Sequence, residues 1–271
     1  MLRRLYFSNF LMIKSTWHLI NKLFLSSSAK KKALLKWDKI VRSFYIHMGK
    51  THFVTKKSGI KYLLDMNNLI DLRIAARGSY EAEQQAFLLE QIQHKGCSMF
   101  CDIGANWGMY TLPIAALEQI DAVHSFEPDE KNRSQLQANI FLNELHNKIT
   151  IHNCAISSFS GQANFSATKP DTDKLQNRGT SKLSVEGETS VTVKKFDDLL
   201  TENNQKTAFK IDIEGNELEA LIGMQIYLQN NQCILQIEAF KNTKDELIKE
   251  MKNTGYNLIH SIGNDYYFSN F

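Results

Sequence analysis

The residues with the clearest chemical potential lie between positions 100 and 108. The run reads Phe-Cys-Asp-Ile-Gly-Ala-Asn-Trp-Gly, so an apolar stretch ends in Asp102, and Gly104 and Gly108 follow. This order is typical of a strand, a tight turn and a helix. Nineteen residues past Gly108, a second acid, Glu127, ends another apolar run. In nucleotide-binding βαβ units, an acid about this far downstream accepts hydrogen bonds from ribose hydroxyls, so the pair predicts an adenosine-containing cofactor.

The spacing of the glycines distinguishes between classes of cofactor. A dinucleotide fingerprint has the form G-x-G-x-x-G, but Asn106 stands where its second glycine should be, which argues against a dehydrogenase. The phosphate loop G-x-x-x-x-G-K-[ST] is also absent from the sequence. The pattern suits S-adenosylmethionine, whose amino group Asp102 can hold and whose carboxylate the turn amides can hold. The expected turn contacts are Gly104, Ala105, Asn106 and Gly108. An ordinary β–turn–α corner, with glycine where φ is positive, is the alternative.

A second group of acids follows the same logic. Residues 209–215 read Phe-Lys-Ile-Asp-Ile-Glu-Gly, and strand alternation puts Asp212 and Glu214 on one face with Lys210. Glu238 ends the next apolar run. Open α/β sheets bind ligands at the carboxyl ends of their strands, so these acids should share one rim with those of the first motif. Acids this close raise each other's pKa unless cations, amides or a ligand compensate. Alternatively, Glu214 and Glu238 cap helices or pair with surface lysines.

These motifs carry a family resemblance. Residues 70–268 resemble the FkbM family of S-adenosylmethionine-dependent methyltransferases. The matching stretches are Gly78–Glu81, Asp102–Gly108, Phe126–Pro128 with Asn139 and Asn143–Leu145, Asn153–Ser157, and Lys210–Gly215. The resemblance implies a Rossmann-like class I methyltransferase fold that acts on hydroxyl oxygens, often of sugars or polyketide-like products.

The pattern of elements predicts an α/β fold with a doubly wound, mostly parallel sheet and an antiparallel C-terminal hairpin. Expected strands are 98–103, 122–126, 149–156, 208–213 and 233–237, and the closing hairpin is 256–261 with 265–269. Expected helices are 81–94, 110–118, 129–145, 217–228 and 244–253. Residues 157–188 are expected to form a short hairpin and a long polar loop. The predicted domains are a basic amphipathic extension (1–50), a lead-in hairpin and helix (51–95) and the S-adenosylmethionine-binding domain (96–271).

Charge is unevenly distributed along the 271 residues. Residues 1–50 hold eleven Lys/Arg and one acid, Asp38, whereas the rest of the chain carries a net −7. Residues 1–45 are predicted to form basic helices that either contact an anionic membrane or pack on the body. We expect no membrane span and no signal peptide, because no uncharged apolar stretch is long enough and no cleavage site follows the first apolar run. The four cysteines fit free thiols in a reducing compartment. The expected location is the cytoplasm or the inner membrane surface.

The working hypothesis is an O-methyltransferase that uses S-adenosylmethionine to methylate a hydroxyl of a sugar, a glycan or a related metabolite. Asp212 is the expected base or substrate orienter, with Glu214 and Glu238 behind it, and Ala155 should lie beside the adenine. No metal site is predicted. One alternative is an RNA-directed methyltransferase, although the acidic body and the lack of an aromatic-interleaved basic stripe lead us to expect no nucleic acid. The other is a non-catalytic, membrane-associated module that binds the cofactor.

Overall fold

A computed structural model describes residues 27–167 and 175–271, and they form two compact units. Of the described residues, the smaller unit comprises 27–55, 62–81 and 175–178, and the larger comprises 56–61, 82–167 and 179–271. No helix in these ranges is long and apolar enough to cross a membrane.

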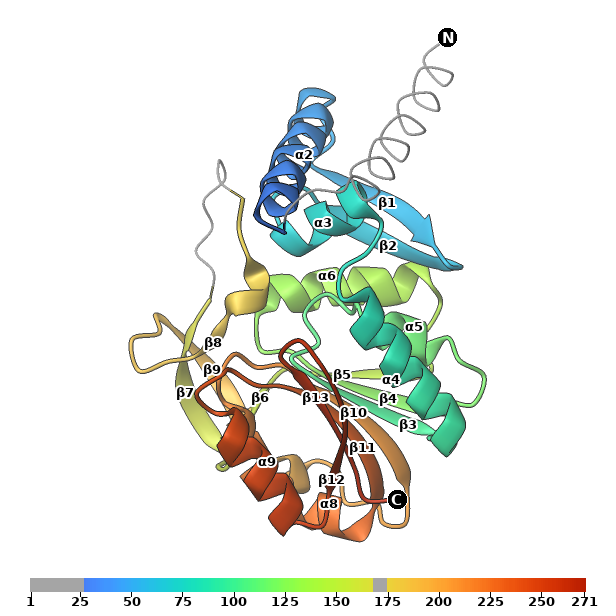
Figure 1. Cartoon of the computed structure of the whole chain (residues 1–271), viewed down its shortest axis with the longest axis vertical. Helices are drawn as coiled ribbons and strands as arrows, with labels where there is room; N and C mark the ends of the chain where they lie inside the picture. The colour runs from blue at the N-terminus through green and yellow to red at the C-terminus, as the bar shows by residue number, and fades with distance from the viewer. Residues whose placement is uncertain (1–26, 168–174) are drawn as a thin grey trace. The chain divides into compact units, whose positions relative to one another are not determined.

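The smaller unit is built on helix α2, Ser27–His47, and helix α3, Leu69–Arg77. The hairpin of β1 (His52–Lys57) and β2 (Ile60–Asp65) lies between them in the chain, as predicted. Figure 1 shows α2 beside α3. The indole of Trp37 donates to the Ala76 carbonyl at 2.9 Å. The α2 helix confirms the C-terminal part of the basic helices predicted over 1–45, whereas residues 1–26 lie outside the described residues. Helix α3 was not predicted.

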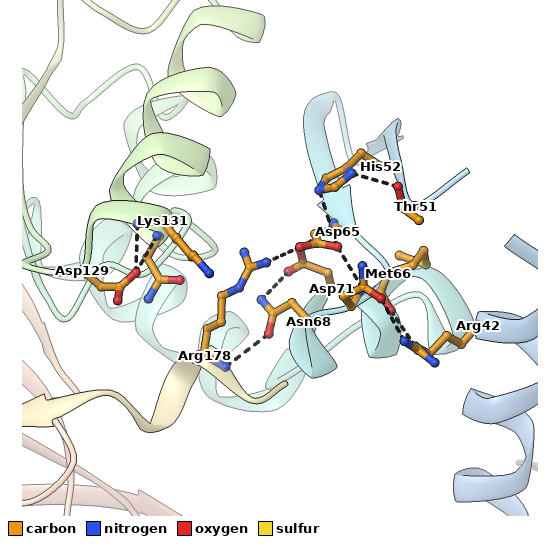
Figure 2. Close-up of polar contacts among 12 residues, drawn as sticks. Arg42, Thr51, His52, Asp65, Met66, Asn68, Asp71, Asp129, Lys131 and Arg178 are labelled. Carbon is orange, nitrogen blue, oxygen red and sulfur yellow. Dashed lines mark hydrogen bonds and ion pairs between the residues drawn. The ribbon is translucent and has the colours of Figure 1, made fainter. Parts of the chain in front are cut away.

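A network of polar side chains holds this unit together (Figure 2). The guanidinium of Arg178 pairs with the buried carboxylate of Asp65. The amide of Asn68 donates to Asp71 at 3.1 Å, and Asp71 accepts from the Asp65 backbone N–H at 2.7 Å. Arg42 of α2 donates to the carbonyl of Met66 at 3.2 Å. Charged hydrogen bonds of this kind stabilise buried polar groups that would otherwise be costly.

The larger unit contains a seven-stranded sheet in the order β12-β13-β11-β10-β3-β4-β5. Its strands are β3 (Met99–Ile103), β4 (Ala122–Phe126), β5 (Ile149–His152), β10 (Lys206–Ile211), β11 (Gln232–Glu238), β12 (Asn257–Ile262) and β13 (Asp265–Ser269). The strands from β5 to β11 are parallel, and β13 and β12 add an antiparallel hairpin. The predicted doubly wound, mostly parallel sheet with a C-terminal hairpin is confirmed.

Helices cover both faces of this sheet (Figure 1). On one face lie α7 (Glu217–Ile222), α8 (Gln225–Asn230) and α9 (Lys244–Asn253), and on the other lie α4 (Ala82–Lys95), α5 (Thr111–Ala115) and α6 (Glu130–Leu142). The first face is a continuous apolar core in which Tyr227 and Met251 pack with strand residues such as Phe209. Because strand side chains alternate between faces, Asp102 and Lys210 point to the other face. The sheet therefore has one largely apolar face and one that buries charge.

The segment after β5 departs from the prediction. The strand expected over 149–156 breaks after His152, and β6 (Ala155–Ile156) joins a second sheet, β6-β9-β7-β8. The other strands of that sheet are β7 (Gly161–Ser166), β8 (Lys182–Leu183) and β9 (Thr189–Lys194). The expected short hairpin is replaced by β7 and β8, which pair within this sheet. Most of the other described residues of 157–188 lie outside strands, as expected for a long polar loop. Polar residues alternate with few apolar ones here, because one side of this small sheet faces solvent.

The helix expected over 217–228 is in fact two short helices. The chain turns at Gly223, where a Cβ atom would lie 2.0 Å from the Ser157 carbonyl oxygen. This contact brings the backbone after β6 against the end of α7. Only glycine allows two backbone segments to approach so closely.

We expect Gly223→Ala to destabilise the larger unit by about 3 kcal/mol, because the added methyl group collides with backbone that cannot move as a side chain would. Gly161→Ala is the matched control, since its Cβ would meet nothing closer than 3.8 Å. Neither glycine has a positive φ. In urea unfolding, the free energy of unfolding of the control should differ from that of the wild type by no more than about 1 kcal/mol. Equal stabilities of the two variants would contradict the close approach at Gly223.

Candidate active site

Asp102 is the penultimate residue of the central strand β3 and is buried, with 2% of its surface exposed. The hydroxyl of Thr111 donates to its Oδ2 at 2.6 Å and lies 2.9 Å from the hydroxyl of Ser125. Burial raises the pKa of Asp102 to about 6, although the Thr111 hydrogen bond and the charge of Lys210 oppose that rise. Asp102 is thus held rigidly at the end of the strand, where sequence analysis expected it.

The turn after Asp102 is tightly packed against the second motif. At Gly104, where φ is +84°, a Cβ would lie 2.0 Å from the carbonyl oxygen of Asp212. The amides of Gly104 and Ala105 both donate to the Phe126 carbonyl, at 3.0 and 3.1 Å, and Gly108 donates to Ala105 at 2.9 Å. These amides are therefore engaged within the protein, which differs from the expectation that they hold a cofactor carboxylate.

Asn106 and Glu127 connect the turn to the end of β4. The Asn106 amide donates to Glu127 Oε2 at 2.7 Å, and the Asp129 amide donates to Glu127 Oε1 at 2.8 Å. Each carboxylate oxygen keeps a further lone pair. Burial raises the pKa of Glu127 to about 8. Asn106 has φ of +52°, and its buried Oδ1 has no hydrogen-bond partner among the described residues. A buried acceptor of this kind is costly to leave unpaired, so this loop is suited to a ligand that donates hydrogen bonds.

Asp212 and Glu238 meet at the same edge of the sheet. The buried ammonium of Lys210 donates to Asp212 Oδ2 at 2.8 Å, and Glu238 shares a hydrogen bond with Asp212. Burial by itself would raise the pKa of Asp212, but the Lys210 charge and the Glu238 hydrogen bond lower it. Burial and the neighbouring Asp212 charge raise the pKa of Glu238 to about 9. At neutral pH, Asp212 is therefore the anion and Glu238 holds the proton between them.

Glu214 lies just beyond this pair, with φ of +56°. Burial and the charges of Asp212 and Glu217 raise its pKa to about 7. Glu217, which sequence analysis did not select, accepts from the amides of Ile213 at 3.2 Å and Gly215 at 2.9 Å. Glu217 thus lies in the first turn of α7, and its side chain bonds back to the loop before the helix, which fixes the backbone that carries Glu214.

The sequence analysis also missed a buried polar group beside Lys210. The ammonium lies 4.9 Å from the centre of the Tyr110 ring. The amide of Gln236 donates to the Tyr110 hydroxyl at 3.0 Å and to Asp265 at 2.7 Å. Gln236 is in register with Lys210, which is in register with Asp102. A sequence signal for this group does exist. Asp102, Lys210 and Gln236 are polar residues at matching positions in three otherwise apolar strands.

The remaining predicted residue, Ala155, is half-buried in β6, beside Val193 of β9. His152, at the end of β5, stacks on Phe126 at 4.4 Å between ring centres and contacts the ring of His124. Burial lowers the pKa of His152 to about 4, so its ring is neutral at physiological pH. In the described ranges, no three His, Cys, Asp or Glu side chains are arranged to hold a metal ion.

The sequence matches one family of known proteins. Residues 102–258 match the family described as the methyltransferase FkbM domain. A curated relative, hexuronic acid methyltransferase AglP of Haloferax volcanii, is 28% identical over 170 residues, which cover 61% of this chain and 66% of that protein. The chain thus spans just under two thirds of that relative.

Two solved structures are also similar. Methyltransferase FkbM from Methylobacillus flagellatus KT has a TM-score of 0.47 and 18% identity, over 73% of this chain and 52% of that one. M. jannaschii TYW2 in complex with AdoMet has a TM-score of 0.40 and 12% identity, over 81% and 84% of the two chains. The match to the family covers both acidic motifs and more than half of the sequence. The protein belongs to the FkbM methyltransferase domain family.

Proposed function

We propose that this protein is an S-adenosylmethionine-dependent methyltransferase that methylates a hydroxyl oxygen of a sugar or glycan. The observation that carries the proposal is the contact of two motifs at one sheet edge, where the Gly104 turn packs on the backbone of Asp212. The motif that contains Gly104 suits a nucleoside, and the motif that contains Asp212 provides an ionised carboxylate beside it. The acceptor class is supported by the relative named as a hexuronic acid methyltransferase.

The described residues fit the cofactor in two respects. The free lone pairs of Glu127 suit the two ribose hydroxyls, and the unpaired Oδ1 of Asn106 suits a donor such as the cofactor's amino group. Asp102 adds negative charge beneath the turn, near the position that a cationic cofactor would take. When bound, S-adenosylmethionine supplies a methyl group on a positively charged sulfur.

Asp212 is proposed as the group that orients the acceptor hydroxyl and receives its proton. Its pKa is lowered, so it is ionised at neutral pH and can accept a hydrogen bond from a hydroxyl. As the oxygen–methyl bond forms, the hydroxyl proton becomes strongly acidic. A weak base such as a carboxylate is then sufficient to accept this proton. Positioning such a base typically contributes a factor of about 10² to 10⁴ to the rate.

Glu238 and Lys210 are proposed to keep Asp212 in this state. Lys210 supplies the opposing charge at 2.8 Å, and the protonated Glu238 donates the second hydrogen bond. Both act through Asp212 as positioning residues. Glu214, with a pKa of about 7, adds a second carboxyl group next to the acceptor position.

The first prediction concerns cofactor binding. Calorimetric titration of the purified protein with S-adenosylmethionine should show binding, and Glu127→Ala should weaken it by about 10-fold or more, because the hydrogen bonds from the ribose hydroxyls to the Glu127 carboxyl group are lost. Glu130→Ala, an exposed acid three residues on, is the control and should bind as the wild type does. If the folded wild type binds no S-adenosylmethionine, the proposed cofactor is wrong.

A second prediction separates binding from chemistry. Asp212→Asn should lower turnover by about 100-fold or more, while the dissociation constant for S-adenosylmethionine stays within a few fold. Transfer of a labelled methyl group to oligosaccharides that contain hexuronic acids is the measurement, and the exposed Asp245→Asn is the control. Near-normal turnover would exclude Asp212 as the base. Label found in RNA and absent from the oligosaccharides would overturn the acceptor class.

The third prediction is a pH dependence of stability. The pKa of Glu238 rises on folding, so its contribution is complete below about pH 4.5 and is lost as pH rises through about 9. Glu238→Gln keeps the hydrogen-bond donor but cannot ionise. The free energy of unfolding of the wild type should therefore fall more steeply than that of Glu238→Gln between these values.

Urea unfolding at pH 5, 7 and 9 tests this difference. Glu246→Gln, on the exposed side of α9, should follow the wild type at every pH. Parallel curves for the wild type and Glu238→Gln would show that Glu238 holds no proton in the folded protein.

A further inference from the structure

Helix α2 has two faces of opposite character. Its exposed residues fall on one continuous arc of about 140° at 3.6 residues per turn. They are Ser28, Lys32, Leu35, Lys36, Lys39, Ile40, Ser43, Ile46 and His47. The opposite side carries Trp37, Asp38 and Val41, which are buried in the smaller unit. The helix is thus fixed by one face, and it presents the other to solvent.

The exposed face of α2 is strongly cationic. Lys32, Lys36 and Lys39 lie near the middle of the arc, and no acid lies on it. The one acidic residue of positions 1–50 is Asp38, which is turned inward and accepts from Arg77 at 2.9 Å. Arg42 is likewise directed inward, to the Met66 carbonyl. The charge of this face is therefore not compensated within α2, and its partner should be anionic.

Aliphatic side chains flank these lysines. Leu35, Ile40 and Ile46 are 44%, 60% and 38% exposed. Lysines alone would also attract nucleic-acid phosphates, but a nucleic-acid surface typically adds aromatic side chains that stack on bases, and the exposed arc of α2 carries aliphatic side chains instead. Lysines beside aliphatic groups match a lipid surface, where ammonium groups meet phosphates and aliphatic groups enter the interface.

We propose that the exposed face of α2 docks this protein on an anionic lipid surface. The helix lies along the surface, with the lysines at the headgroups and the aliphatic side chains of Leu35 and Ile40 inserted beside them. The buried face stays packed in the smaller unit, held by the Trp37–Ala76 and Arg77–Asp38 contacts. The surface is thus a preformed and rigid one. This inference does not depend on the proposed catalytic activity.

The test is sedimentation of the full chain with vesicles of phosphatidylcholine, with or without phosphatidylserine. The wild type should bind only the vesicles that contain phosphatidylserine, and less as salt is raised. Replacing Lys32, Lys36 and Lys39 with Glu should weaken binding by about 100-fold, given the usual contribution of each lysine. Leu35→Ser with Ile40→Ser should weaken it by about 10-fold at unchanged charge.

The matched control reverses three exposed lysines of the larger unit: Lys241, Lys249 and Lys252. It should bind vesicles as the wild type does. All variants should also keep the wild-type affinity for S-adenosylmethionine or, if none is found, the wild-type unfolding curve. Equal loss in the control and α2 variants, or vesicle binding unaffected by the α2 changes, would overturn the proposal. Tighter binding of the wild type to single-stranded RNA than to the vesicles would do so as well.

Discussion

The larger unit depends on one buried cation. Lys210 is 3% exposed in the central strand β10, where an unpaired ammonium would be prohibitively costly. Its charge is balanced by Asp212 at 2.8 Å and by the face of the Tyr110 ring, with Asp102 in register on the next strand. Removing one partner of such a group leaves an uncompensated charge, which typically costs about 3 to 5 kcal/mol. The acids at this sheet edge are therefore part of the fold as well as candidates for chemistry.

In the same region, the backbone of the turn after β3 packs directly against the backbone of Asp212. The Asp212 amide donates to the Ile103 carbonyl at 3.1 Å, and the Gly104 backbone approaches the Asp212 carbonyl too closely for any side chain. A shift of the turn after β3 must therefore move the backbone of Asp212. We infer that the turn after β3 and Asp212 keep a fixed spacing because they share backbone contacts. Methyl transfer requires such a fixed spacing, since the reacting oxygen must lie in line with the bond that breaks.

Sequence reasoning predicted the sheet correctly, because long apolar runs that end in acids leave few alternatives. It failed where the local signal was weak. The polar alternation around β7 and β9 resembles a loop, and the break at Gly223 depends on a distant carbonyl of Ser157. At the candidate site it selected the acids and placed Lys210 on the same face, but it missed Gln236 and Tyr110, because these two acquire their importance only through strand register. The sequence also gave no sign that the amides of Gly104 and Ala105 donate to the carbonyl of Phe126.

A shared proton allows Asp212 and Glu238 to lie side by side at this edge without strong repulsion. With Glu238 protonated and Asp212 ionised, the group of Lys210, Asp212 and Glu238 has no net charge. A neutral hydroxyl can then approach Asp212 without displacing a counterion. Were both carboxyls ionised, the excess charge would favour a cation over a hydroxyl as the neighbour of Asp212. The high pKa of Glu238 thus favours a neutral group over a cation as the neighbour of Asp212.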